Sequence, residues 1–291
     1  MTKIGIHFGY FNRDWNTDFI QQIEHIKRLG LDILEVAPAP LLALSKEERD
    51  RIAETAKANQ ITLTFSVGLN ASQDLASEDA SIRENGIRFT KDTFQIMHEM
   101  GSNIYSGVDI GAWNQTFTTG VTDKLPYLSR SAESMKEIMK SAEELGITVG
   151  VEVVNRYESS LVNTAAEAMA YVDMVGSPNC KILLDTYHMN IEEDSFSDAI
   201  RLVGDKLAHF HVGESNRKPP SPHGRMPWDE ITGALKDINY TGAIVMEPFI
   251  KMGGEVGRDI KVWRDISQNA SNEEMDQLVR DAAAMLREKM S

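Results

Sequence analysis

The sequence predicts an α/β protein folded as a closed (β/α)8 TIM barrel, and three observations support this prediction. Short β-branched segments alternate with longer segments of helical periodicity along the whole chain. Eight strand-like segments can be counted. The length of 291 residues suits one barrel, because such barrels commonly form single units of about 250 residues. We therefore expect one barrel domain over residues 1–291.

The predicted strands are short and apolar, as expected for parallel strands that are covered on both faces. In chain order they span residues 4–9, 33–36, 62–67, 103–106, 148–152, 181–185, 207–211 and 243–247. The predicted helices carry apolar residues at helical spacing. They span residues 19–29, 46–58, 82–100, 127–145, 165–175, 195–203, 228–238 and 273–289.

Local signals at the helix ends agree with this order. Gly30, Gly101 and Gly146 each follow a predicted helix and precede a strand, where glycine can adopt the left-handed conformation that ends a helix. Ser271 with Glu274 has the spacing of a capping box at the start of the last helix. The longest segments between elements follow strands, on the side where barrels place active sites; they are residues 68–79, 107–125, 214–227 and 248–257.

Composition excludes several classes of function. The net charge of −14 and the absence of a basic cluster argue against a nucleic-acid or anionic-membrane partner. Cys180 is the only cysteine, so no internal disulfide or multi-thiolate site can form, and a reducing compartment fits. The first residues resemble a strand rather than a signal peptide, and we expect a cytoplasmic protein. Dinucleotide, Walker and serine-nucleophile motifs are absent from the sequence.

Four consecutive late strands end in a side chain that can bind a metal: Glu152, Asp185, His211 and Glu247. The spacings between them are 33, 26 and 36 residues, and each matches one βα unit, so all four converge at one end of a barrel. Three carboxylates and an imidazole suit Mn²⁺, Mg²⁺ or Co²⁺ better than a thiolate-rich zinc site. We predict one divalent cation per subunit at this position.

Glu152 and Glu247 come from strands five and eight, which approach the barrel centre from separate directions. One carboxylate could remove a proton from a carbon next to a carbonyl, and the other could return it from the opposite face. The cation would polarise the carbonyl and stabilise the enediolate. The pair is therefore our candidate for the catalytic acid and base.

Other polar residues near these strand ends have two interpretations. Strand alternation places His209 on the same face as His211 but one layer deeper, which favours a hydrogen-bonded histidine of the core over a ligand. His7, near the end of strand one, is either a substrate contact or structural. Three residues lie a few positions downstream of the ligands and are either solvated loop residues or candidates for substrate binding; they are Glu158, His188 and Arg217. Three aromatic residues follow strands one, four and eight and either anchor loops or form a wall for sugar carbons; they are Trp15, Trp113 and Phe249.

Several separated segments together resemble the ketose 3-epimerase family, which comprises D-tagatose 3-epimerases and D-psicose (D-allulose) 3-epimerases. They are EVVNRYE (152–158), LDTYHMNIEED (184–194), HFHVGESNR (209–217), GRMPWDEI (224–231), VMEPF (245–249) and DIKVWRDIS (259–267). The resemblance implies a xylose-isomerase-like barrel that uses Mn²⁺ or Co²⁺ to interconvert C3 epimers, such as D-fructose and D-psicose or D-tagatose and D-sorbose. It also implies a homodimer or homotetramer.

The same resemblance implies roles for individual residues. Glu152, Asp185, His211 and Glu247 would bind the metal, and Glu152 with Glu247 would form the acid/base pair. The O1 to O3 end of the sugar would be held by three further side chains, those of Glu158, His188 and Arg217.

The sequence also departs from the family pattern at several positions. Tyr157 and Tyr187 replace phenylalanine, His7 replaces an aromatic residue, Phe11 replaces tryptophan, and the loop 219–225 has one extra residue. His7 and Phe11 belong to the region that faces the distal sugar carbons in the family. Preference at C4 to C6 therefore stays open.

Four other functions remain to be compared with C3 epimerisation. An aldose–ketose isomerase or an inosose dehydratase could use the same metal on the same scaffold but would act at another carbon. A barrel-type DNA repair endonuclease is disfavoured by the net charge. A sugar-binding protein without catalysis would have no use for an acid/base pair.

Overall fold

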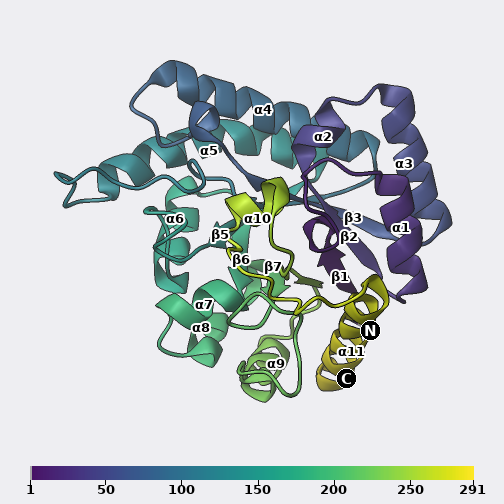
Figure 1. The fold of residues 1–291 in the computed structure, drawn as a ribbon. Helices are drawn as coiled ribbons and strands as arrows, with labels where there is room; N and C mark the ends of the chain where they lie inside the picture. The colour runs from purple at the N-terminus through teal and green to yellow at the C-terminus, as the bar shows by residue number, and fades with distance from the viewer. Residues whose placement is uncertain (1) are drawn as a thin grey trace.

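The computed structural model describes residues 2–291, in which eight parallel strands form a closed barrel in chain order (Figure 1). Each strand pairs with the next, and β8 pairs with β1 to close the ring. The predicted fold class is thus confirmed. The strands are β1 Ile4–His7, β2 Ile33–Val36, β3 Thr62–Gly68, β4 Ile104–Val108, β5 Thr148–Val153, β6 Cys180–Asp185, β7 Leu207–Val212 and β8 Ala243–Met246.

Helices surround the barrel (Figure 1). They are α1 Phe19–Arg28, α2 Pro38–Leu42, α3 Lys46–Ala58, α4 Ala80–Glu99, α5 Leu125–Leu145, α6 Ala165–Val175, α7 Thr186–Glu192, α8 Phe196–Val203, α9 Trp228–Asp237, α10 Gly254–Asp259 and α11 Asn272–Met290, with 3-10 turns η1 Phe8–Tyr10, η2 Ala71–Gln73 and η3 Gly204–Lys206. Within residues 2–291, none of them is long and apolar enough to cross a membrane. The assignment of residues 1–291 to a single domain stays a prediction.

The expected helix ends are present. Gly30, Gly101 and Gly146 have φ angles of 76°, 73° and 66°, the left-handed values that end a helix before a strand. At the start of α11, the Glu274 N–H donates to Ser271 Oγ, and the Ser271 N–H donates to Glu274 Oε2 at 2.7 Å. This reciprocal pair is the predicted capping box.

The sequence did not indicate α2, α7 and α10, each of which has seven residues or fewer. Segments this short cannot show a helical period, so only their local contacts form them. The Asp185 carboxylate accepts the Tyr187 N–H and caps α7 at the end of β6. In α10, the Val256 N–H donates to the Arg13 carbonyl, which attaches this helix to the loop that follows β1.

Apolar side chains fill the space between the strands and the surrounding helices. Inside the barrel, by contrast, buried polar side chains gather near the carboxyl ends of the strands; they include Glu35, Glu152, Asp185, His209 and His211. Burying such groups costs free energy unless they are paired, so their concentration at one end of the barrel marks the candidate site.

Candidate active site and metal centre

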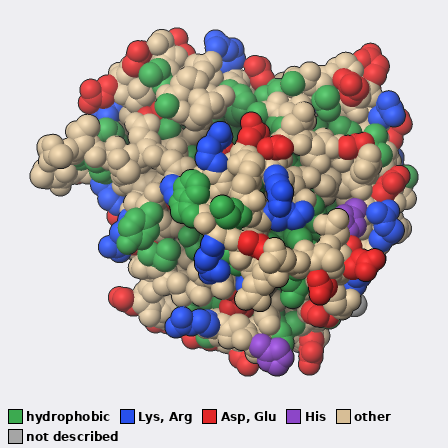
Figure 2. Space-filling model, viewed as in Figure 1, with side chains coloured by type: hydrophobic (Ala, Val, Ile, Leu, Met, Phe, Trp, Pro, Cys, Tyr) green, Lys and Arg blue, Asp and Glu red, His purple; other side chains and the backbone are tan. Residues whose placement is uncertain are grey.

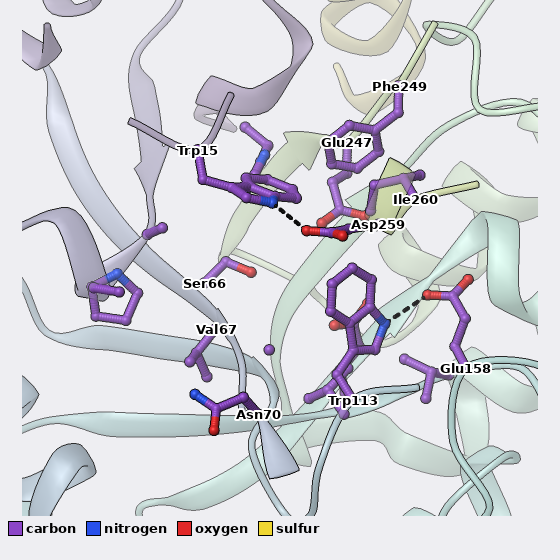
Figure 3. Close-up of a pocket in the computed structure, with 18 of the residues that line it drawn as sticks. Trp15, Ser66, Val67, Asn70, Trp113, Glu158, Glu247, Phe249, Asp259 and Ile260 are labelled. Carbon is purple, nitrogen blue, oxygen red and sulfur yellow. Dashed lines mark hydrogen bonds between the residues drawn. The ribbon is translucent and has the colours of Figure 1, made fainter. Parts of the chain in front are cut away.

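A cavity of about 370 Å³ opens at the carboxyl end of the barrel. Its polar part contains Glu152, Glu158, His188, Arg217 and Glu247. Much of the remaining wall is aromatic or aliphatic (Figure 3), including Trp15, Val67, Trp113 and Phe249. Polar side chains such as Ser66, Asn70 and Asp259 also line it. A concave site with an apolar wall and a few convergent polar groups is suited to a small polar molecule such as a sugar.

The four predicted ligands converge at the carboxyl end of the barrel, where the cavity lies. Glu152, Asp185, His211 and Glu247 are buried, and each offers one ligand atom within 4.8 Å of the others. The His211 Nδ1 atom lies 3.9 Å from Glu152 Oε1 and 3.7 Å from Glu247 Oε1. Oxygen and nitrogen atoms bound to one cation at about 2.1–2.4 Å lie no more than about 4.8 Å apart, so the spacing fits one ion.

Two further observations fit a divalent cation. Nδ1 of His211 is buried and has no hydrogen-bond partner among the described residues. Burial and the carboxylates of Glu152 and Asp185 raise the pKa of Glu247 to about 8, although Arg217 and His211 oppose the shift. Three carboxylates this close repel one another, and a bound cation would offset the repulsion. The donor set therefore suits a hard divalent ion.

Arg217 lies beside the carboxylates. Its Nη1 donates to Asp185 Oδ2 at 3.2 Å and to Glu247 Oε2, while its guanidinium stacks 3.9 Å from the centre of the Tyr187 ring. Arg217 Nη2 also lies 3.7 Å from Glu158 Oε1. A planar guanidinium held in this way presents fixed donors to the cavity.

Glu158 and His188 complete the polar side of the cavity. Glu158 accepts hydrogen bonds from Trp113 Nε1 at 3.0 Å and Asn155 Nδ2 at 3.1 Å. His188 Nδ1 accepts the Asn155 N–H, and its Nε2 lies 3.5 Å from Glu152 Oε1. Burial acts to raise the pKa of Glu158, but the proximity of His188 and Arg217 and the hydrogen bonds from Trp113 and Asn155 outweigh it and lower the pKa to about 2. Glu158 is therefore an ionised acceptor.

The chain is similar in sequence to proteins of a known family. Residues 23–287 match the family model described as "Xylose isomerase-like TIM barrel". A D-psicose 3-epimerase of Agrobacterium fabrum is 45% identical over 98% of both chains. One of Ruminiclostridium cellulolyticum is 43% identical over 98% of this chain and 95% of the relative. The chain belongs to the ketose 3-epimerase family. As a member, it is an enzyme of the isomerase class.

A solved structure of the family agrees with this assignment. The D-psicose 3-epimerase of Clostridium cellulolyticum, crystallised with D-tagatose, superposes with a TM-score of 0.96 at 42% identity and covers 100% of both chains. The xylose-isomerase-like fold expected from the sequence is thus confirmed.

Trp15, Trp113 and Phe249 all line the cavity, and the two tryptophans also anchor loops. Trp15 Nε1 donates to Asp259 Oδ2 at 2.8 Å, which connects the loop after β1 to α10 (Figure 3). Trp113 makes the corresponding bond to Glu158 (Figure 3). Anchoring a loop and lining the cavity are therefore compatible roles for the two tryptophans, because the indole N–H makes the hydrogen bond while the ring lines the cavity. Sugar contact stays a prediction.

His7 lines the cavity beside Trp15 and Phe249, with ring centroids 6.2 and 5.5 Å away. Its Nδ1 accepts the Gly9 N–H at 3.1 Å, and burial lowers the pKa of the ring to about 4. The ring is therefore neutral at pH 7 with its proton on Nε2.

Phe11 is not among the residues that line this cavity. Its ring packs against those of Tyr10 and His25, at centroid distances of 5.0 and 4.7 Å. The strand expected over residues 4–9 ends at His7 and is followed by the η1 turn. A place for Phe11 near the distal sugar carbons stays a prediction.

One polar residue of the site was missed by sequence reasoning. Glu35 lies in β2, is fully buried, and contacts both His209 and His211 at 2.7 Å. The interpretation of His209 as a hydrogen-bonded core histidine agrees with this contact. Burial opposes the protonation of His211, but Glu35 and Glu247 outweigh it and raise the pKa of His211 to about 10. The signal in the sequence was a carboxylate inside the apolar strand ILEV.

Proposed function

We propose that this enzyme catalyses the metal-dependent epimerisation of free ketoses at C3, with D-fructose and D-psicose or D-tagatose and D-sorbose as substrate pairs. The observation that carries the proposal is the pair Glu152 and Glu247, two buried carboxylates from different strands at the base of a sugar-sized cavity. The names of the relatives support the substrate class.

Each residue of the site has a task in this reaction. One carboxylate of the pair takes the proton from C3, and the other returns a proton to the opposite face. When bound, a divalent cation, Mn²⁺ by preference with Co²⁺ or Mg²⁺ as alternatives, would favour negative charge on the sugar oxygens.

The remaining polar residues orient the sugar. Glu158, His188 and Arg217 surround one end of the cavity, and we assign them to the O1 to O3 end of the ketose. Arg217 and His188 donate to sugar oxygens, and ionised Glu158 accepts from a hydroxyl group. Trp15, Trp113 and Phe249 cover the carbon skeleton and exclude water from C3.

The proposal is tested with purified protein, Mn²⁺ and D-fructose in D₂O. We expect D-psicose to form and deuterium to appear at C3, and Glu152→Gln and Glu247→Gln each to lower kcat by at least about 100-fold. The exposed Glu133→Gln variant is the matched control. No exchange at C3 with any of several ketoses would contradict the proposal.

The product also distinguishes the other functions. NMR would show a displaced carbonyl for an aldose–ketose isomerase and the loss of water for an inosose dehydratase. A sugar-binding protein without catalysis would bind ketose but show no turnover, so neither glutamine variant would change the activity. A homodimer or homotetramer remains part of the proposal, and light scattering would measure it.

A further inference from the structure

A second group of buried polar side chains lies directly behind His211. It consists of Glu35, His209 and Thr64, which are 0%, 0% and 1% exposed. Glu35 Oε1 lies 2.7 Å from His211 Nε2, and Glu35 Oε2 lies 2.7 Å from His209 Nε2. Thr64 Oγ1 donates to Glu35 Oε2 at 2.9 Å. Glu35 therefore links two histidines that alternate along β7.

Glu35, His209 and His211 could also be taken for a second metal site, because their ligand atoms lie close together. The distances favour hydrogen bonds. Nitrogen and oxygen atoms at 2.7 Å share a proton, whereas neighbouring ligands of one cation with bonds of about 2.1 Å lie about 3 Å apart. Glu35 Oε2 contacts Thr64 and His209 within hydrogen-bond distance, and Oε1 lies 2.7 Å from His211 Nε2, so the group fits a carboxylate held between its polar neighbours.

The contact with Glu35 determines which nitrogen of His211 faces the cavity. An ionised carboxylate only accepts hydrogen bonds, so its neighbour Nε2 carries a proton. In the neutral ring that binds a cation, Nδ1 then carries the lone pair, and it faces Glu152 and Glu247 at 3.9 and 3.7 Å. A metal ligand of this kind needs its second ring nitrogen bonded, which sets both the tautomer and the ring orientation.

We propose that Glu35 is the positioning residue of the metal centre: it holds His211 in the Nε2–H tautomer, so that His211 binds the cation through Nδ1. Thr64 and His209 hold Glu35 in turn. The negative charge of Glu35 also makes the His211 ring a stronger donor to a cation. This inference rests on the proposed function, because it assumes the metal site of Glu152, Asp185, His211 and Glu247.

The experiment measures Mn²⁺ binding by metal-stripped protein, using calorimetry and the EPR signal of free Mn²⁺. We expect Glu35→Gln to weaken Mn²⁺ binding by about 10- to 100-fold and Thr64→Val to weaken it less. Asp74→Asn is the matched control, because Asp74 is also a buried carboxylate but accepts backbone N–H groups in a loop away from the ligands. Its affinity is expected to equal that of the wild type.

A second measurement does not depend on any variant. The ¹⁵N shifts of histidine-labelled wild-type protein loaded with Mg²⁺ report the tautomer of His211, and we expect the proton on Nε2. A proton on Nδ1 would overturn the inference, as would a folded Glu35→Gln variant that binds Mn²⁺ within twofold of the wild type. Wild-type protein that binds no Mn²⁺ would instead contradict the metal site of the proposed function.

Discussion

His7 is a neutral hydrogen-bond donor in the otherwise apolar wall that contains Trp15 and Phe249. Its Nδ1 is taken by the Gly9 N–H, so Nε2–H is the group available to a ligand. A donor at this position favours ketoses with a hydroxyl group within its reach. The neutral form is stable at pH 7 because burial lowers the pKa of the ring to about 4.

We predict that His7→Phe raises KM for the preferred ketose by about 2- to 10-fold, the effect of one lost hydrogen bond of about 0.5–1.5 kcal/mol, with kcat little changed. The measurement compares KM for ketoses that differ at C4 to C6. His98→Phe, on the exposed side of α4, is the control. An equal KM of wild type and His7→Phe for every sugar would show that His7 is structural.

At the scale of elements, the contact between α4 and η2 positions one side of the cavity. Gly86 lies within α4, and a Cβ atom placed there would lie 2.3 Å from the Gln73 carbonyl oxygen and 2.7 Å from Leu75 Cδ2. Gln73 and Asn70, at η2, line the cavity. The missing side chain therefore allows the helix to approach the loop that forms the wall.

Because of this contact, we expect a glycine-to-alanine substitution in a helix to lower stability, which is the opposite of the usual effect. Alanine at a helix interior normally stabilises by roughly 0.5–1 kcal/mol, but we expect Gly86→Ala to destabilise by about 1–3 kcal/mol, because the added methyl group overpacks the contact. Urea unfolding measures the change. In Gly233→Ala, within α9, no atom lies within 4 Å of the new Cβ, and we expect the normal stabilisation. A stability change of the same sign in both variants would refute this packing argument.

At the scale of the whole molecule, stability depends on pH through groups that change protonation on folding. Asp109, just after β4, is 2% exposed, and neither carboxylate oxygen has a hydrogen-bond partner among the described residues. Burial raises the pKa of Asp109 well above its ordinary value of 3.8. From that value up to the folded pKa, the folded state binds more protons than the unfolded state, so stability falls as pH rises.

We therefore predict that Asp109→Asn gains stability relative to the wild type as pH rises from 5 toward the folded pKa of Asp109, by up to about 1.4 kcal/mol per pH unit. Urea unfolding at each pH measures the difference. The control is Asp79→Asn, since hydrogen bonds from Ser81 lower the pKa of Asp79. The difference in the free energy of unfolding between this variant and the wild type should stay constant over this range. A constant difference for Asp109→Asn as well would contradict the predicted shift.

The barrel and the convergence of the four ligands could be predicted from the sequence alone. Strands and helices of ordinary length carry their own periodicity, and parallel strands bring their carboxyl ends to one edge whatever the details of packing. The positions of Glu152, Asp185, His211 and Glu247 at successive strand ends were therefore enough to place them together, and the family motifs indicated the reaction at C3.

How these ligands are supported, and which side chains form the cavity wall, became apparent only in the folded structure. Glu35 reaches His211 across the barrel interior from a strand that is not its neighbour, and no local pattern encodes such a contact. Likewise, Phe11 is not among the residues that line the cavity and packs instead against His25 of α1, a residue 14 positions further along the chain. Contacts between distant segments depend on the closed barrel, so sequence periodicity cannot reveal them.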